Sequence, residues 1–335
     1  GLTTTQIAGL NATDIGELAS TQLAALASTQ LGALSTTNMV ALTTTQLAGL
    51  SSTQLAGLSA TNLSALDETQ IGSLTTTQTA GLTASQLRNL SETDFAELTS
   101  TQIGALTSTQ IGAISATNLS AMDETKTAGL TTTQLAGMTV TQLRGLSVTD
   151  MAELTETQIG ALTATQLGAL SASNLSELSD TQMSVLSSTQ LKGLTATQLK
   201  GLTETDIGEL SQTQVGYLTA TQLGSLSVTS LMAMDTTQMQ VLSTTQLKGL
   251  TTTQLKGLET TDIGELTTTQ LGSLLSTQLG ALSTTVIAAL TETQVQALTT
   301  TQIPGLTVTQ IDELTTTSMS AMTSTQLSAF TVTQV

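Results

Sequence analysis

The chain has 335 residues with 24 acidic and 7 basic side chains, and it contains no Cys, no His and no Trp. Without Cys or His it cannot form a disulfide, a thiolate or imidazole metal site, a Cys nucleophile or a Ser-His-Asp triad, so we expect no enzyme and no cofactor. The net charge of −17 argues against nucleic acid as a partner. No apolar run approaches the ~20 residues of a membrane span.

An internal repeat of eight residues runs through the whole chain from Leu2. It reads L-[T/S]-x-T-Q-[L/I]-x-[G/A] and gives 41 complete octads and six further residues, with no insertion or deletion. The first octad position is apolar in all 42 occurrences and the sixth in 40 of 42, the exceptions being Thr79 and Thr127. We therefore predict a single uninterrupted octapeptide-repeat solenoid over residues 1–335.

Local signals within each octad predict one short helix. Thr3 stands three residues before Gln6, which is the spacing of a capping box, and Leu2 and Ile7 have the spacing of a hydrophobic staple. Acidic residues such as Asp67 occur at the following start positions, where a helix N-terminus favours negative charge. The small eighth residue, often Gly, suits a helix stop. The predicted fold class is an all-α solenoid of very short helices.

A β-solenoid is the alternative, because Thr favours strands over helices. In that fold the eighth octad position would share the core with the fourth and sixth, and buried unpaired carboxylates would be costly there. The 5-3-5-3 spacing of the apolar residues would also require a corner in every octad. A flat Thr-bearing sheet would suggest binding to ice or another repetitive surface. The polar or large residues at the eighth position are Glu17, Glu97, Glu153, Glu209, Tyr217 and Glu265.

The fourth octad position is Thr in 40 of 42 copies, with Ser85 and Ser173 as the others. Helix capping does not explain this preference, because the capping residue is the second one. We expect the fourth side chain to point at the neighbouring coil, with its methyl group packed and its hydroxyl bonded to backbone in a continuous ladder.

A second period of 56 residues, or seven octads, is superimposed on the first. Asp replaces Gln at the fifth position, Glu follows three residues later, and a cation precedes each Asp by six residues. Tandem duplication explains this superrepeat, and whole turns of the solenoid would also align the charges along one stripe. The series are Asp94, Asp150, Asp206 and Asp262; Glu97, Glu153, Glu209 and Glu265; Arg88, Arg144, Lys200 and Lys256; and Asn62, Asn118, Asn174, Ser230 and Val286.

The Asp and Glu pairs are the only candidate metal ligands. A calcium site needs about six to eight oxygens, so calcium at these pairs is the minor alternative; the preferred interpretation is a capping Asp with a solvated ion pair. A glycosidase would need a pocket that an unbroken repeat does not build. The calcium candidates are Asp94, Glu97, Asp150, Glu153, Asp206, Glu209, Asp262 and Glu265.

Four single positions depart from the repeat. Lys126 replaces Gln beside Asp123, which predicts that it neutralises its acidic neighbours. Thr79 and Thr127 leave the inner row without an apolar group and predict soft spots. Pro304 lies inside a proposed helical turn and removes one backbone donor, which a one-turn helix can tolerate.

The octad from Leu130 to Gly137, L-T-T-T-Q-L-A-G, and its copies resemble the Thr-Gln-rich short repeats of very large bacterial surface proteins, including repeat-in-toxin-type adhesins and fibre proteins. The resemblance covers the whole chain. It implies an exported, repetitive spacer or filament, with adhesive or anchoring modules elsewhere in the parent chain. The glycine-aspartate nonapeptides that bind calcium in that toxin family are missing, so the resemblance implies no calcium dependence.

We therefore expect a non-catalytic structural protein, the stalk or filament subunit of a bacterial cell-surface or extracellular fibre or adhesin. Both ends carry ordinary repeat sequence, whereas solenoids usually need polar caps. The expected partners are other copies, joined end to end or laterally, or flanking repeats of a longer chain. The expected location is extracellular or at the cell surface.

Overall fold

The computed structural model describes residues 1–335 and contains helices but no strand. Every octad except the last, which starts at Phe330, forms one helix of three to six residues. The all-α solenoid of short helices is confirmed. The β-solenoid alternative is wrong, and with it goes the flat Thr-bearing sheet that the ice-binding alternative required. No helix in the structure combines the length and apolar character needed to span a membrane.

The chain divides into two compact units, Gly1–Ala169 and Leu170–Val335, while the octad register continues through the division. The first unit holds α1 Thr4–Ala8, α2 Ala12–Glu17, α3 Ser20–Ala24, α4 Ser28–Leu31, α5 Thr36–Val40, α6 Thr44–Ala48, α7 Ser52–Ala56, α8 Ala60–Leu63, α9 Glu68–Gly72, α10 Thr76–Ala80, α11 Ala84–Arg88, α12 Glu92–Ala96, α13 Ser100–Gly104, α14 Ser108–Ile111, α15 Ala116–Ser120, α16 Glu124–Ala128, α17 Thr132–Ala136, α18 Val140–Gly145, α19 Val148–Ala152, α20 Glu156–Ala161 and α21 Ala164–Leu167. The second unit holds α22 Ala172–Ser176, α23 Asp180–Ser184, α24 Ser188–Lys192, α25 Ala196–Gly201, α26 Glu204–Glu209, α27 Gln212–Tyr217, α28 Ala220–Leu223, α29 Val228–Met232, α30 Thr236–Gln240, α31 Thr244–Leu247, α32 Thr252–Gly257, α33 Thr260–Glu265, α34 Thr268–Leu271, α35 Ser276–Leu279, α36 Thr284–Ala288, α37 Glu292–Ala297, the 3-10 helix η1 Ile303–Gly305, α38 Val308–Asp312, α39 Thr316–Ala321 and α40 Ser324–Leu327.

Helices start where the capping box predicts. Before α1, the backbone N–H of Gln6 donates to Thr3 Oγ1 at 3.3 Å, and the N–H of Thr3 donates to Gln6 Oε1 at 2.8 Å. This reciprocal pair satisfies two of the donors that a helix N-terminus leaves free, and it recurs in most octads.

Helices do not stop in the way that the glycines predict. No residue of the chain has a positive φ, so a left-handed glycine ends none of the helices, and that prediction is wrong. The eighth position is small for another reason, which is close approach between layers. A Cβ atom added to Gly57 would lie 2.6 Å from Cβ of Ser28, 29 residues earlier.

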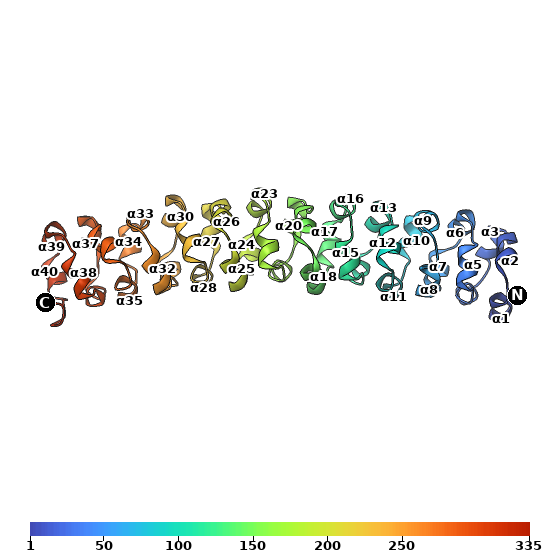
Figure 1. Cartoon of the computed structure of the whole chain (residues 1–335), viewed down its shortest axis with the longest axis horizontal. Helices are drawn as coiled ribbons and strands as arrows, with labels where there is room; N and C mark the ends of the chain where they lie inside the picture. Colours follow the sequence, from blue (N-terminus) through green and yellow to red (C-terminus); the bar gives the residue numbers. More distant parts are fainter. The chain divides into compact units, whose positions relative to one another are not determined.

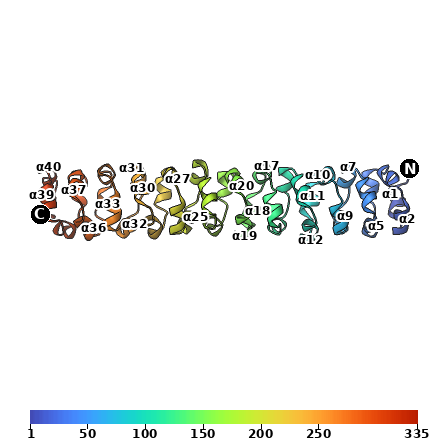
Figure 2. The same cartoon turned by 90° about the horizontal axis from the view of Figure 1, so that it is seen from above.

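Within each unit, the helices that pack most extensively lie three octads apart, as α4 against α7 and α22 against α25. Figures 1 and 2 show the helices of each unit following one another around a shared interior. The first and sixth octad positions fill that interior; Leu31 is 0% and Leu34 is 4% exposed. Each turn of helix therefore buries two apolar groups, and each layer completes the core of the previous one.

Pro304 changes the local helix type without breaking the repeat. Its octad forms η1 instead of an α-helix. Gln302 in the same octad still donates to the carbonyls of Leu271 and Leu274 at 2.8 Å. The missing backbone donor is thus accommodated within one short turn.

The two Thr residues of the inner row are both buried but differ in hydrogen bonding. Thr79 Oγ1 donates to the carbonyl of Thr75 at 3.1 Å. Thr127 is 5% exposed, its hydroxyl has no partner in the protein, and it borders a cavity of about 10 Å³ with Leu119, Met122 and others. Thr127 is therefore the weaker of the two positions.

We predict that Thr127→Val raises the free energy of unfolding by about 1 kcal/mol, because a methyl group replaces a hydroxyl that lacks a partner. Thr79→Val is the matched control, since it loses the bond to Thr75 and gains less. Urea denaturation followed by circular dichroism measures both; a larger gain for Thr79→Val would contradict the prediction.

Candidate functional site

The fifth octad position carries the contacts that join one layer to the next. Gln142 is 3% exposed. Its Oε1 accepts from the backbone N–H and the hydroxyl of Thr139 at 2.7 and 3.1 Å. Its Nε2 donates to the carbonyls of Ile111 and Ile114, both at 2.7 Å, 31 and 28 residues earlier. Both donors and both acceptor sites of the amide are thus used.

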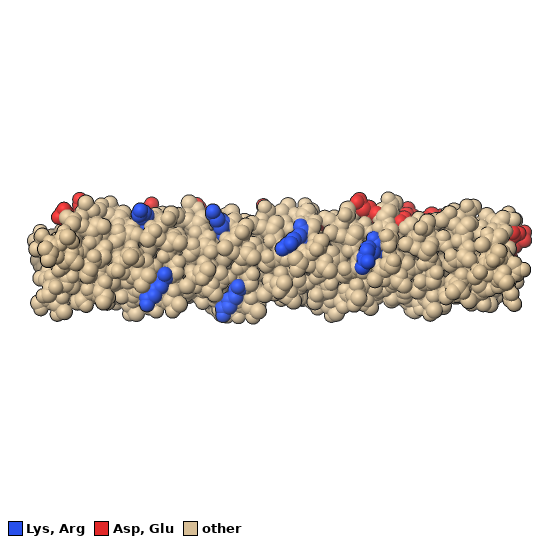
Figure 3. All heavy atoms as spheres, turned by 90° about the horizontal axis from the view of Figure 1, so that it is seen from below, with Lys and Arg blue, Asp and Glu red and all other residues tan.

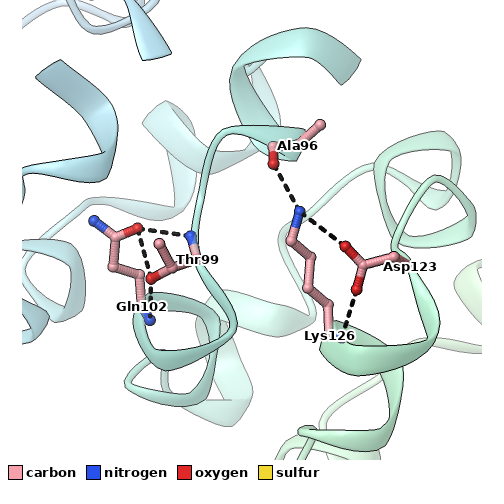
Figure 4. Close-up of polar contacts among 5 residues, drawn as sticks. All are labelled: Ala96, Thr99, Gln102, Asp123 and Lys126. Atoms are coloured by element: carbon pink, nitrogen blue, oxygen red, sulfur yellow. Dashed lines mark hydrogen bonds and ion pairs between the residues drawn. The ribbon is translucent and has the colours of Figure 1, made fainter. Parts of the chain in front are cut away.

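The same four bonds recur along both units and form what we call the glutamine ladder. In Figure 4 the Oε1 atom of Gln102 meets the N–H and hydroxyl of Thr99. Gln254 repeats the pattern in the second unit, with donations to Leu223 and Leu226. The ladder Gln residues from Gln46 to Gln326 are between 1% and 7% exposed.

The prediction that the fourth-position Thr forms this ladder is wrong. Those Thr side chains are exposed. Where their hydroxyls do bond, they reach only the capping residue two positions before, as Thr309 reaches Thr307 at 3.0 Å. The structure gives no physical account of why Thr is so dominant at this position. A continuous ladder exists as expected, but the fifth side chain makes it.

Shorter or charged donors replace Gln at a few rungs. Asn62 Nδ2 donates to the carbonyl of Leu34 at 2.9 Å, and Ser230 Oγ donates to Leu202 at 2.7 Å. Both reach only the carbonyl 28 residues earlier, because their side chains are shorter. Val286 has no donor and is 1% exposed. The third series of the superrepeat is thus a set of weakened rungs.

Lys126 serves as a rung through its ammonium group. Nζ donates to the carbonyl of Ala96 at 2.6 Å and pairs with Asp123 at 3.5 Å, as Figure 4 shows. The predicted pairing with an acidic neighbour is confirmed. No other ion pair occurs in the chain, so the expected pairs between the superrepeat cations and aspartates are wrong.

The superrepeat aspartates act as caps, as predicted, and some have a hydroxyl partner in the previous layer. The N–H groups of Ser147 and Thr203 donate to Asp150 and Asp206, both at 2.6 Å. An Asp cannot donate to carbonyls, and instead Ser120 donates its hydroxyl to Asp150 at 2.6 Å, 30 residues later. Ser176 and Asp206 repeat this contact at 2.5 Å. Asp94 is buried and Asp262 half-buried, and each caps its helix from the same octad position.

The superrepeat glutamates face the octad 29 residues earlier. Thr236 donates its hydroxyl to Glu265 at 2.7 Å. The residues at the same spacing from Glu97 and Glu209 are Glu68 and Asp180, which are carboxylates.

One carboxyl oxygen of each of Glu97, Glu153 and Glu209 is buried without a hydrogen-bond partner. Burial, a hydrogen bond shared with Asp180 and the negative charges of Asp180 and Asp206 raise the pKa of Glu209 from its ordinary 4.5 to about 7. Burial, followed by the charges of Asp94, Glu68 and Asp67, also raises the pKa of Glu97.

These carboxylates do not form a metal centre. No group of three or more Asp or Glu residues in the structure is arranged to hold a metal ion. The eight calcium candidates are instead divided into helix caps and half-buried acids. The Lys and Arg side chains visible in Figure 3 are spread separately over one surface, and the visible Asp and Glu lie at its edge. Nothing in this arrangement has the geometry of a catalytic site.

The 56-residue superrepeat equals two of the 28-residue steps by which a rung reaches the previous layer. A residue 56 positions further along therefore occupies the same octad position two layers on. This spacing lets Asp150 and Asp206 each find a Ser, and Glu97 and Glu209 each find an acid, in the preceding layer. Sequence analysis found the superrepeat but not these partners. The signal was the near-absence of fifth-position residues that lack a donor.

Four stretches of the chain match the family described as the ALTTAQ repeat: residues 23–60, 231–268, 256–292 and 272–308. They lie in both units and together cover less than half of the chain. The chain thus contains a repeat region similar to ALTTAQ repeats. No curated protein matches the chain.

We predict that Gln142→Glu lowers the free energy of unfolding by at least about 3 kcal/mol, because it leaves two carbonyls without donors and buries a charge against them. Gln22→Glu is the matched control. The Nε2 of Gln22 has no carbonyl partner and the side chain is exposed, so its loss is expected to be small. Equal losses in urea denaturation would show that the ladder does not hold the layers.

The raised pKa of Glu209 predicts that acid stabilises the second unit. Between pH 4.5 and about 7 the folded state keeps a proton that the unfolded state releases, so the free energy of unfolding falls as the pH rises through this window and then levels off. Glu209→Gln should raise the melting temperature at pH 8 and leave it nearly unchanged at pH 5.

Glu265→Gln is the matched control, since Glu265 faces the hydroxyl of Thr236 instead of a carboxyl. It is expected to give no gain at pH 8. Thermal melts of the three proteins at both pH values provide the measurement, and the same pH dependence in wild type and Glu209→Gln would refute the assignment to this residue.

Proposed function

We propose that the chain is a non-catalytic structural repeat, acting as an extended stalk or a filament-forming subunit of a bacterial cell-surface or extracellular fibre or adhesin. The observation that carries the proposal is the glutamine ladder. Side-chain amides bond successive layers throughout both units, and no octad is interrupted. The repeated side chains are thus used for holding layers together.

The similarity to ALTTAQ repeats supports a repetitive structural role. The cavities inside the layers also favour this role over ligand binding, since the one that Thr127 borders measures only about 10 Å³. Ligand pockets usually measure about 300 to 1,000 Å³ and carry convergent polar groups. We place the protein outside the cell or at the cell surface, with other copies or flanking repeats as its partners.

A deletion series tests the spacer role. Removing residues 98–153 takes out one 56-residue superrepeat and joins Glu97 to Leu154 in the same octad register. Because a solenoid grows by stacking nearly equivalent layers, the largest dimension in small-angle scattering should fall by about one sixth, with helicity per residue unchanged.

Removing residues 98–149 is the matched control, because the 52-residue deletion shifts the register by half an octad and places polar residues in the core. We expect this variant to lose its cooperative thermal transition. A wild-type scattering profile typical of a compact sphere, or a largest dimension that ignores the 56-residue deletion, would exclude the spacer role.

A further inference from the structure

The first layer has three rungs without a layer to bond. The side chains of Gln6 and Gln22 bond only within their own octads, and Asp14 likewise bonds only to Asn11 in the cap. Gln30 is the first rung that reaches another octad, at the carbonyl of Leu2. Leu2 in this layer is 45% exposed, whereas most first-position residues are buried.

The last layer has the complementary gap. Gln334 is the final rung and donates to Ile303 and Leu306. The carbonyls of Leu314, Met322 and Phe330 accept no hydrogen bond, and those of Ile311, Met319 and Leu327 accept only a backbone N–H. These are three carbonyl pairs with the spacing that three further rungs would use.

The apolar part of the last layer is open as well. Leu327 is 45% exposed. A cavity of about 300 Å³ is lined by Ile311, Met319, Leu327, Phe330, Gln334 and Val335. Within the units the same octad positions are closed by the apolar row of the next layer.

We propose that the first layer of one copy docks on the last layer of a second copy and continues the octad register across the joint. This deepens the proposed structural role by naming the partner and the mode of association. Gln6 then takes the place of a rung eight residues after Gln334, with donations to Ile311 and Leu314. Gln22, two rungs later, reaches Leu327 and Phe330.

The rung between them tests this register independently, because Asp14 cannot donate to a carbonyl. Inside the chain, Asp150 and Asp206 each accept from a Ser hydroxyl 30 residues earlier. In the proposed register the residue at that spacing from Asp14 is Ser320, which is exposed. Ser occupies the seventh position in only six octads of the chain, so this match distinguishes the register.

Glu17 provides a second match. Glu265 accepts from the hydroxyl of Thr236, 29 residues earlier. The residue at that spacing from Glu17 across the joint is Ser324, which also carries a hydroxyl. The carboxylates of Asp14 and Glu17 thus both meet donors. The match belongs to the two layers themselves, whatever precedes Gly1 or follows Val335 in a longer chain.

Cysteine crosslinking tests the joint directly, because the chain has no Cys of its own. Within the units, a Cβ on Gly49 would lie 3.2 Å from Cβ of Ser20, 29 residues earlier, close to the Cβ separation of a disulfide. Across the joint the equivalent pair is Gly9 and Thr316. Single variants Gly9→Cys and Thr316→Cys, with tags of different size, are mixed and oxidised with diamide.

The mixed disulfide dimer should exceed both homodimers. Thr260→Cys replaces Thr316→Cys as the matched control, since Thr260 is also an exposed third-position residue but lies inside the second unit. A yield of mixed dimer no greater than that control would overturn the proposal. Predominant homodimers would also overturn it and indicate lateral or head-to-head contact.

Charge placement at the joint tests the register. Ser320→Asp opposes two carboxylates and should weaken association, seen as a dissociation constant at least about tenfold higher in sedimentation velocity. Ser184→Asp, at the same octad position on an exposed surface of the second unit, should change it by less than about twofold. Adding Asp14→Lys to Ser320→Asp should restore association, since Lys126 already shows that a Lys can act as a rung.

Circular dichroism confirms folding of each variant before these measurements. Equal association of Ser320→Asp and wild type, or failure of the double variant to recover, would overturn the register. The 56-residue deletion leaves both end layers intact, so the spacer role can fail while the joint is upheld, and the reverse.

Discussion

The buried side-chain amide of the fifth octad residue is the interaction on which the rest of the structure depends. Helices of four to six residues leave most of their backbone carbonyls without an intrahelical donor. A buried carbonyl without a partner is costly. Gln supplies two donors to the previous layer and two acceptor sites to its own helix cap. One residue therefore joins local capping to tertiary stacking, which explains its regular recurrence.

The ladder also defines which substitutions the repeat tolerates. Asn, Ser and Lys keep at least one donor and are found as rungs. Asp has none, and Asp150 and Asp206 are each placed one 30-residue step after a Ser that donates to them instead. The cost of an altered rung is thus offset by a second residue in the preceding layer. This pairing across layers gives the superrepeat a physical meaning beyond duplication.

The half-buried glutamates show where the repeat carries unfavourable electrostatics. Glu209 lies beside Asp180 and Asp206, and its pKa is raised to about 7. Glu265, at the equivalent octad position, accepts a hydroxyl from Thr236 instead. The same backbone geometry therefore gives either an acid pair or a neutral contact, according to one residue 29 positions earlier. The acid pairs make stability depend on pH without forming a metal centre.

The sequence alone determined the octad, its capping box, its two apolar rows and hence the all-α solenoid, because these depend on contacts within about eight residues. It also predicted that Lys126 pairs with an acidic neighbour. It could not assign the ladder to Gln or explain the small eighth residue, since both depend on which residues meet 28 to 31 positions apart. That separation is set by how many octads complete a layer, and only packing of the apolar rows decides it.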